Sequence, residues 1–570
     1  FMALDLSQAE STQWSQEFRL QSDWDGPFNF NLGANWLRYK TEENYWVFSN
    51  VFSMMAVQQN GGSPVTSGNF DRYCNLTPQG QAGVDAGTLD PHTCAYIDNT
   101  PLNDIINGQG GDGHNYIRST SISQTESWAV FGEGYWSVRD DLRLTLGLRF
   151  TDDTKTITPV PTQLLASTPH VYKPDATGLV GRGYPRYPDE EMHWGEWTGR
   201  AAIDWKPDLS FTNDTLIYAS FSRGYKGGGG NPRDRDYNPN LVNVPSLPSR
   251  YDPEFVNAYE IGTKNSLAGG RLVFNATGFF YDYRDYQVAQ LIERAIHNEN
   301  FDAHIWGAEF ETAWAPTRNF RLDATVGLLR TRIGDGEESV DVMNRTQGNP
   351  DWVVIKPWPG SPSTCIVPAD VVGRLINRND EVGTTFPNLL GSLSLRTLCP
   401  DRQLINSWVP GSGSQFNYAD GWTDAWQALE PLSYNPFDAP NGGRGFSADL
   451  SGNELPNAPR WTFNIGAQYR IELPAGWDLM LRGDYYRQAD SWMRVYNLRP
   501  YDRLEGWGNA NLSMTLTNRT SDLVVQAYVK NVLDDTPITD GFTGPDDLGN
   551  ATNVFTLDPR IIGVSVKKSF

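Results

Sequence analysis

The most constraining feature of this sequence is an alternation of apolar and polar residues that continues over ten or more positions. Between Leu504 and Leu516 every second residue is apolar or small, and the residues between them are almost all polar. Successive side chains of a strand point to opposite faces, so the pattern predicts strands with one apolar and one polar face. It recurs in segments 142–150, 321–328 and 562–570. Such lengths exceed the ~5–6 residues of ordinary strands and suit a tilted membrane-spanning strand of ~9–11 residues.

The connections between these segments alternate in length. Short turns occupy 316–319, 473–476 and 518–521, whereas long segments occupy 46–119, 157–191, 227–253, 334–458 and 532–558. Short periplasmic turns and long extracellular loops are typical of outer-membrane barrels. The sequence therefore predicts an all-β fold, a transmembrane antiparallel β-barrel with long extracellular loops.

Fifteen strands are predicted, whereas bacterial single-chain barrels have an even number. The predicted ranges are 13–22, 26–45, 120–138, 140–156, 192–206, 214–226, 254–266, 270–290, 303–315, 320–333, 459–472, 477–493, 503–517, 523–531 and 560–570. The opening FMALDLSQ shows no charged region followed by an apolar core, so it does not resemble a signal peptide. We therefore expect strands to be missing at the N-terminal side, and a sheet that does not close on itself.

The composition agrees with this fold once the alternation is recognised. The 570 residues would otherwise suggest about four domains. A net charge of −22 disfavours nucleic acid as a partner, and 12% aromatic residues disfavour disorder. No apolar run approaches the ~18 residues of a membrane helix. The hydrophobic content of 39% is nevertheless sufficient, because only alternate residues of a barrel strand need be apolar.

The four cysteines fall into two pairs inside the long loops. There is no CxxC motif and only six histidines, so a zinc site is disfavoured. We expect two local disulfides, Cys74–Cys94 in loop 46–119 and Cys365–Cys399 in loop 334–458, formed in an oxidising compartment. The alternative is four free thiols.

Aromatic residues collect near the predicted strand ends. An interfacial girdle of aromatic side chains would account for them, although the strand propensity of aromatic residues is an equally good explanation for any single tyrosine. The residues are Tyr281, Tyr283, Tyr286, Tyr485, Tyr486, Trp492 and Tyr496.

Several segments resemble the barrel motifs of the TonB-dependent outer-membrane receptors. Segment 218–229, with Arg223, Gly224, Tyr225 and Lys226, resembles a family strand that ends in a glycine-rich loop. Segment 529–534, with Asn531, and the end of the chain, with Phe570, resemble later motifs. Further matches, in the family's order, are Ser15–Leu20, Tyr259–Lys264, Gly307–Glu311 and Leu455–Trp461.

The resemblance implies a function that the residue pattern alone does not. Family members have 22 strands preceded by a plug domain, so residues 1–570 would be the C-terminal barrel portion, with the plug absent from this sequence. The implied activity is uptake across the Gram-negative outer membrane, driven by the TonB–ExbB–ExbD complex, with a ferric siderophore as the family's usual ligand. An oligosaccharide or another bulky nutrient, a surface-anchored scaffold that binds partners, and a passive porin are the alternatives. Lipopolysaccharide and other outer-membrane lipids would surround the barrel.

No residue pattern indicates an enzyme. Neither GxSxG nor HExxH is present, and the glycines after Tyr225 lack the order of a phosphate-binding loop, so we expect them to give a flexible exit from the strand. No cofactor is expected, although acidic loops with Glu190, Glu337 or Asp546 leave bound Ca²⁺ open.

Tryptophans of the longest predicted loop are the best candidates for ligand contact, because exposed aromatic rings stack on sugars or flat chelates. The alternative is that they belong to a small core within a disulfide-linked loop. They are Trp352, Trp358, Trp408, Trp422 and Trp426.

Overall fold

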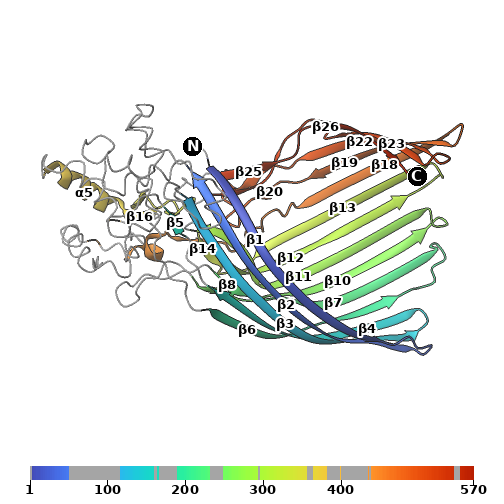
Figure 1. Cartoon of the computed structure of the whole chain (residues 1–570), viewed down its shortest axis with the longest axis horizontal. Coiled ribbons are helices and arrows are strands. Elements are labelled where there is room, and N and C mark those ends of the chain that lie inside the picture. The colour runs from blue at the N-terminus through green and yellow to red at the C-terminus, as the bar shows by residue number, and fades with distance from the viewer. Residues whose placement is uncertain are drawn as a thin grey trace, which may run out of the picture.

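One large antiparallel sheet dominates the computed structural model (Figure 1). The structure describes residues 3–49, 116–158, 163–165, 189–231, 248–292, 295–355, 364–381, 398, 434, 438–544 and 552–569. Fifteen strands of the sheet follow one another in chain order, each hydrogen-bonded to the next, and β5 (Gln163–Leu165) pairs with β3 outside that path. The fifteen are β1 (Ala3–Gln21), β2 (Phe28–Ser49), β3 (Tyr116–Arg139), β4 (Leu142–Thr158), β6 (Glu190–Trp205), β7 (Asp214–Lys226), β10 (Glu254–Leu267), β11 (Leu272–Ile292), β12 (Ala295–Trp314), β13 (Phe320–Ile333), β18 (Trp461–Leu473), β19 (Trp477–Gln488), β22 (Gly508–Asn518), β23 (Leu523–Lys530) and β26 (Ile561–Lys568).

The predicted strands and the open sheet are both confirmed. Each of the fifteen predicted ranges overlaps one strand of the path, although several strands, such as β1 and β12, begin well before the predicted range. Within the residues that the structure describes, β1 and β26 are the two edges of the sheet and do not pair with each other. Figure 1 shows the tilted strands curving into a barrel wall, with the blue β1 and the red β26 at its two ends.

Two predicted strands are clearly shorter than expected, because β19 ends at Gln488 within range 477–493 and β22 begins at Gly508 within range 503–517. Range 503–517 divides into β21 (Arg503–Leu504), which pairs with β20 (Ser491–Trp492), and β22, which begins at Gly508. The chain bends between them because the Gly506 amide donates to the Asp490 carboxylate, 2.8 Å away. A side chain at Gly506 would lie 2.7 Å from the carbonyl oxygen of Gln488, so this close approach requires glycine.

The apolar face of every strand is turned outward. Leu146, Leu512 and Ile562, all predicted on apolar faces, have 62%, 54% and 74% of their surface exposed. A soluble protein would not expose such a continuous apolar surface, but a barrel in lipid requires it. No helix among the described residues has the length and apolar character to cross a membrane.

The height of this apolar band is the same on six strands that rise from the short turns. On each of them the first charged residue of the outward face lies nine or ten residues after the strand begins. Ten residues at ~3.3 Å each, tilted by ~40°, rise about 25 Å, which is the height of the apolar band of an outer-membrane barrel. These charged residues are Arg38, Asp152, Arg223, Asp282, Arg330 and Arg487.

The two ends of the sheet differ as the sequence predicted. At the turn end, connections such as 140–141, 315–319 and 474–476 are short. At the loop end the described residues form small hairpins, an α-helix and a 3₁₀ helix. These are β8 (Gly229–Gly230) with β9 (Arg250–Tyr251), β14 (Glu338–Val340) with β17 (Ser447–Asp449), β15 (Trp352–Ile355) with β16 (Cys365–Pro368), β24 (Ile538–Thr543) with β25 (Thr552–Thr556), α5 (Ala369–Glu381) and the 3₁₀ helix η4 (Pro440–Gly443).

The glycines that follow Tyr225 do not form the flexible exit that the sequence predicted. Gly229 and Gly230 pair with β9, and neither has a positive φ. A side chain at Gly228 would lie 2.5 Å from the Tyr251 carbonyl oxygen, and one at Gly230 would lie 1.9 Å from Ile157. Glycine is needed here because the hairpin packs against its neighbours without room for a Cβ atom.

Candidate functional site

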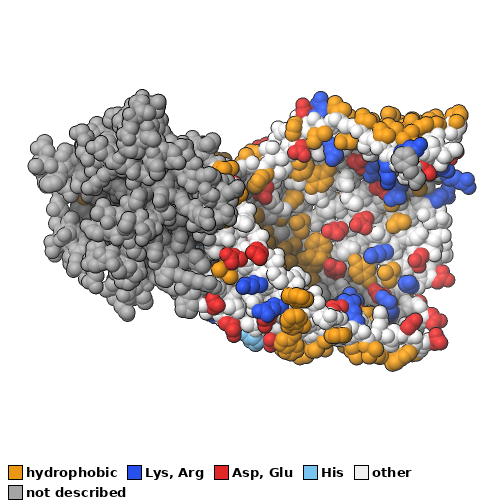
Figure 2. All heavy atoms as spheres, viewed as in Figure 1, with side chains coloured by type: hydrophobic (Ala, Val, Ile, Leu, Met, Phe, Trp, Pro, Cys, Tyr) orange, Lys and Arg blue, Asp and Glu red, His pale blue; other side chains and the backbone are white. Residues whose placement is uncertain are grey.

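The inner face of the sheet is polar and carries paired charges. Arg482 donates to Asp484 over 2.6 Å and lies 3.4 Å from Asp323, so one guanidinium joins β13 and β19 across β18. On the other half of the sheet, Arg200 of β6 pairs with Glu133 of β3 over 2.8 Å. Figure 2 shows charged side chains in the hollow of the sheet and apolar ones along its outer margins. Such a face suits contact with water, a polar solute or another folded domain rather than lipid.

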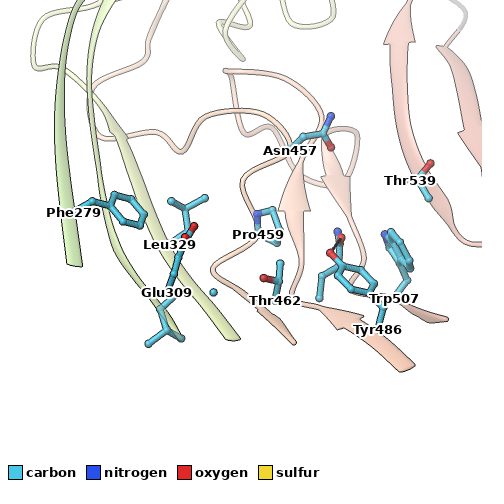
Figure 3. Close-up of a pocket in the computed structure, with 12 residues that line it drawn as sticks. Phe279, Glu309, Leu329, Asn457, Pro459, Thr462, Tyr486, Trp507 and Thr539 are labelled. Carbon is cyan, nitrogen blue, oxygen red and sulfur yellow. Dashed lines mark hydrogen bonds between the residues drawn. The ribbon is translucent and has the colours of Figure 1, made fainter. Parts of the chain in front are cut away.

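A cavity of about 380 Å³ lies on this inner face, at the loop end. Figure 3 shows Phe279 and Leu329 on one side of it, and Tyr486 and Trp507 on the other. Tyr486 and Trp507 form an aromatic pair with ring centroids 5.1 Å apart. The remaining lining residues are Glu309, Gly327, Leu328, Asn457, Pro459, Thr462, Gln488 and Thr539.

The chemistry of the cavity is aromatic and hydrogen-bonding. Glu309 is the charged residue among those that line it. Gln488 accepts a hydrogen bond of 2.8 Å from the Tyr486 hydroxyl, which fixes the tyrosine ring. Aromatic faces beside a few oriented polar groups are typical of sites for small organic ligands. The carboxylate favours a ligand that presents N–H or O–H donors.

Three loop segments, 334–349, 438–458 and 489–507, pack together above β11–β13, and we call them the loop rim. Its apolar core joins residues from the rim to residues of β12 and β13. The fully or almost fully buried members are Phe301, Ala303, Ile333, Leu450, Leu455 and Val495. The rim is therefore part of the folded wall.

A buried ion triad joins the rim segments. Arg494 lies 2.6 Å from Asp341 and 2.6 Å from Asp502, and the two carboxylate side chains are 2% and 0% exposed. Burial raises the pKa of Asp502 above its usual range, although the Arg494 guanidinium and the Leu498 amide oppose the shift. Burial and the nearby Glu299 likewise raise the pKa of Tyr496, whose hydroxyl bonds to Gln290 over 2.8 Å.

The rim also positions part of the cavity wall. The Asn457 amide donates to the Trp492 carbonyl over 2.8 Å, and the Gln488 amide donates to the Trp507 carbonyl over 2.9 Å. Glu454 accepts hydrogen bonds from the Trp492 indole and from Arg460. These contacts hold Asn457 to β20 and Trp507 to the end of β19, so the cavity has a fixed shape on this side.

Of the five loop tryptophans predicted as ligand contacts, the structure describes one, Trp352. Trp352 lies in β15, where its ring meets that of Phe446 edge-on at 5.5 Å. The described part of this loop has a small core of its own, in which Ile355, Cys365, Val367, Val371, Leu375 and Leu398 are buried. Trp358, Trp408, Trp422 and Trp426 lie outside the described residues, so their role stays a prediction.

Only one of the four cysteines, Cys365, lies within the described residues. Cys365 is disulfide-bonded, whereas Cys74, Cys94 and Cys399 lie outside the described residues. The predicted pairings therefore stay predictions.

The residues of the family motifs have structural contacts rather than a shared site. Arg223 lies over the Phe255 ring at 4.6 Å and donates to Asn257. Gly224 has no room for a side chain beside Val256, the Tyr225 ring lies 5.6 Å from that of Phe255, and Lys226 pairs with Glu254.

Asn531, in a later motif, closes the base of the last loop. It has a left-handed φ of 48°, and its side-chain amide donates to the carbonyl oxygens of Asp535 and Asp558. Phe570 lies outside the described residues.

The predicted aromatic girdle is wrong for several of its members. Tyr486 lines the inner cavity, the Tyr281 hydroxyl donates to Glu260 on the inner face, and Tyr496 is enclosed by the rim. Phe279 and Trp507, which also line the cavity, were not among the predicted site residues. The alternation itself contained the signal, because Tyr485 and Tyr486 are consecutive and one of them must face inward.

No group of three or more His, Cys, Asp or Glu residues within the described ranges is arranged to hold a metal ion. Calcium in the remaining loop segments stays an open expectation.

One family model matches most of the chain, and solved structures share its fold. Residues 3–360 and 393–532 match the family model described as TonB dependent receptor-like, beta-barrel. The ferric yersiniabactin uptake receptor FyuA from Yersinia pestis is similar in structure, with a TM-score of 0.55 and 13% identity, over 100% of this chain and 56% of that one. The siderophore receptor PiuA from Acinetobacter baumannii has a TM-score of 0.51 and 13% identity, over 98% and 56%. The chain thus spans just over half the length of these receptors. No curated protein matches it.

Proposed function

Because the chain belongs to the family of TonB-dependent receptor-like β-barrels of the outer membrane, we propose that it forms the wall of a receptor for energised uptake of a scarce solute. The long-loop end then faces the medium and the short turns face the periplasm. The family is one of receptors and transporters, so the proposal requires binding and passage but no covalent chemistry.

The observation that carries the proposal is the inner cavity beside the loop rim. Its aromatic pair, Tyr486 and Trp507, comes from two different strand ends and faces Phe279 across the cavity. A passive pore lined for water would not need aromatic rings held at fixed positions. A receptor that captures an organic ligand before transport would.

We propose a ring-bearing metal chelate, a ferric siderophore, as the ligand. Flat aromatic faces can stack on catechol or phenol rings, and Glu309, Asn457 and Gln488 can bond to amide or amine groups. Of the two receptors that share the fold, FyuA is described as a ferric yersiniabactin uptake receptor and PiuA as a siderophore receptor. An oligosaccharide is the second candidate, because the same rings can stack on sugars.

The proposal includes partners that act on the inner face. A plug domain that contacts charged groups of the inner face, such as Arg482 and Asp484, would block the lumen until the TonB–ExbB–ExbD complex displaces it. A polar inner wall without lipid contact suits such a domain.

Uptake and binding measurements test the proposal. Cells that express the receptor are given radioactive iron bound to catecholate, phenolate or hydroxamate siderophores, with and without a protonophore. At least one chelate should enter, and the protonophore should stop its entry. Entry that survives the protonophore would indicate a passive porin. No entry, together with a stoichiometric surface partner in pull-downs, would indicate a scaffold.

Neighbouring phenylalanines on β11 give a matched pair of variants for the cavity. Phe279→Ala removes a ring from the cavity, whereas Phe280→Ala removes an outward ring that is 41% exposed. Trp507→Ala removes the opposite wall. We expect Phe279→Ala and Trp507→Ala to weaken chelate binding by about fivefold to 150-fold, which corresponds to about 1–3 kcal/mol for a lost stacking contact. Phe280→Ala should leave the affinity unchanged. Equal affinity in all three variants would place the ligand elsewhere.

A further inference from the structure

The charged residues just above the apolar band are not equivalent in their contacts. Arg38 pairs with Glu126 at 3.2 Å, and Asp152 lies 3.0 Å from His193. Asp282 lies between Arg284 and His304, at 3.4 and 3.3 Å. Each of these charges therefore has a partner within the protein.

Arg223 has no carboxylate partner among the described residues, but it lies over the Phe255 ring and donates to Asn257. Arg330 and Arg487 differ from these four residues. Both are exposed on the outward face, and neither has a carboxylate within ion-pair distance among the described residues. Arg330 donates only to the carbonyl oxygen of its neighbour Leu329, at 3.0 Å. Two guanidiniums at the upper edge of an apolar band thus keep most of their donors available.

The two arginines stand on either side of one exposed tryptophan. β18 lies between β13 and β19. Trp461 is opposite Leu328, one outward position below Arg330. Phe463, the next outward residue of β18, is opposite Arg487. The arginines are therefore two strand spacings, about 10 Å, apart across the sheet, and four residues, about 13 Å, apart along the strands. Trp461 lies midway along this diagonal, with aliphatic surface below it.

We propose that Arg330, Arg487 and Trp461 form a binding site for a phosphorylated glycolipid of the outer leaflet. The guanidiniums take the phosphate groups, because their planar donors match phosphate oxygens in number and direction. The acyl chains lie on Leu328, Phe463 and the apolar band below. This inference rests on the outer-membrane location of the barrel and not on the transport proposal.

Charge and position together select this occupant. A protein partner with acidic side chains would have to approach at the boundary between lipid and water, where the lipids already present bring phosphates to the same height. Arg330 and Arg487 lie about 25 Å above the turn end, at the upper limit of the apolar band. Free phosphate would satisfy the arginines but would leave Trp461, 41% exposed, without a contact.

The test compares lipid retention by the full-length receptor in nanodiscs of phosphatidylethanolamine. Lipid A with both phosphates, or lipid A without phosphates, is added at equal amounts, and bound lipid is counted by native mass spectrometry. The variants are R330Q/R487Q and the matched control R318Q, which removes an exposed arginine from turn 315–319 at the opposite end. A lysine variant, R330K/R487K, keeps the charges and loses only the fork geometry.

We expect R330Q/R487Q to bind phosphorylated lipid A about thirtyfold more weakly, at about fivefold for each arginine near the charged lipid surface. R318Q should bind it as the wild type does, and R330K/R487K should be intermediate. Wild-type retention of the lipid without phosphates should be as low as that of the glutamine variant. Undiminished binding by R330Q/R487Q, an equal loss in R318Q, or equal retention of both lipids would each overturn the proposal.

Discussion

Replacing Arg494 by methionine should release the loop rim from the barrel wall. The substitution keeps most of the side-chain volume but leaves Asp341 and Asp502 buried, with side-chain exposures of 2% and 0%, without their cation. Removing one partner of a buried ion pair costs about 3–5 kcal/mol. Since 1.4 kcal/mol is a factor of ten in an equilibrium, local opening of segment 489–507 should become about two to three and a half orders of magnitude more frequent.

Amide hydrogen exchange measures that opening directly, since exchange of a protected amide reports its local opening equilibrium. The amides of Asp502 and Met493, which bond to the Leu498 carbonyl and the Asp502 carbonyl, are suitable reporters. The control is Arg503→Met, which breaks an exposed pair with Asp490, whose side chains are 40% and 50% exposed. Such a pair is worth at most about 1 kcal/mol, so exchange should change less than tenfold.

The effect of Arg494→Met should depend on pH. Burial already raises the pKa of Asp502, and loss of the guanidinium raises it further. A carboxyl whose pKa is raised by folding contributes stability below its unfolded value of about 3.9, and that contribution is lost as the pH rises through the folded value. The variant should therefore regain protection as the pH falls towards 4. Unchanged exchange in Arg494→Met at pH 7, or an equal loss in Arg503→Met, would refute the reasoning.

Three further predictions concern the wall and the last loop. Leu512→Arg places a charge in the middle of the apolar band and should cost about 2–4 kcal/mol, whereas Ser513→Arg on the inner face should be tolerated; urea unfolding in lipid vesicles compares them. Gly307→Ala puts a Cβ atom 2.0 Å from the Leu328 carbonyl oxygen and should cost about 1–3 kcal/mol, whereas Gly278→Ala, whose nearest atom is 3.9 Å away, should be neutral; equal unfolding midpoints would contradict this. Asn531→Ala removes both hydrogen bonds at the loop base, about 1–3 kcal/mol, and should speed proteolysis of segment 532–558 on intact cells; unchanged cleavage rates would show that other contacts close the loop.

The sheet could be predicted from the sequence because its physical cause is local. Lipid on one side and a polar lumen on the other impose a two-residue period on each strand, and that period is readable from one segment at a time. The same reasoning extended the strand at 503–517 too far, because Leu504 and Gly506 continue the alternation through the bend. The contact that ends the strand comes from Asp490, on another segment.

The candidate site was less predictable because its members come together only on folding. Phe279 and Trp507 are more than 200 positions apart, and nothing in either local sequence indicates the other. Asp341 and Arg494 likewise meet across 153 positions. The loop tryptophans stood out by composition, yet the one within the described residues, Trp352, packs against Phe446.

On six of the strands that rise from a short turn, the interval to the first outward charge is nearly uniform, so it corresponds to the thickness of the membrane's apolar layer. Inserting one residue into a rising strand would turn every later side chain to the opposite face. Inserting two would restore the faces but lift one charge by about 5 Å above its neighbours, since each residue of a tilted strand rises about 2.5 Å. Adaptation to a thicker or thinner membrane would therefore require paired changes in all neighbouring strands at once, so the spacing itself records the bilayer in which this protein folds.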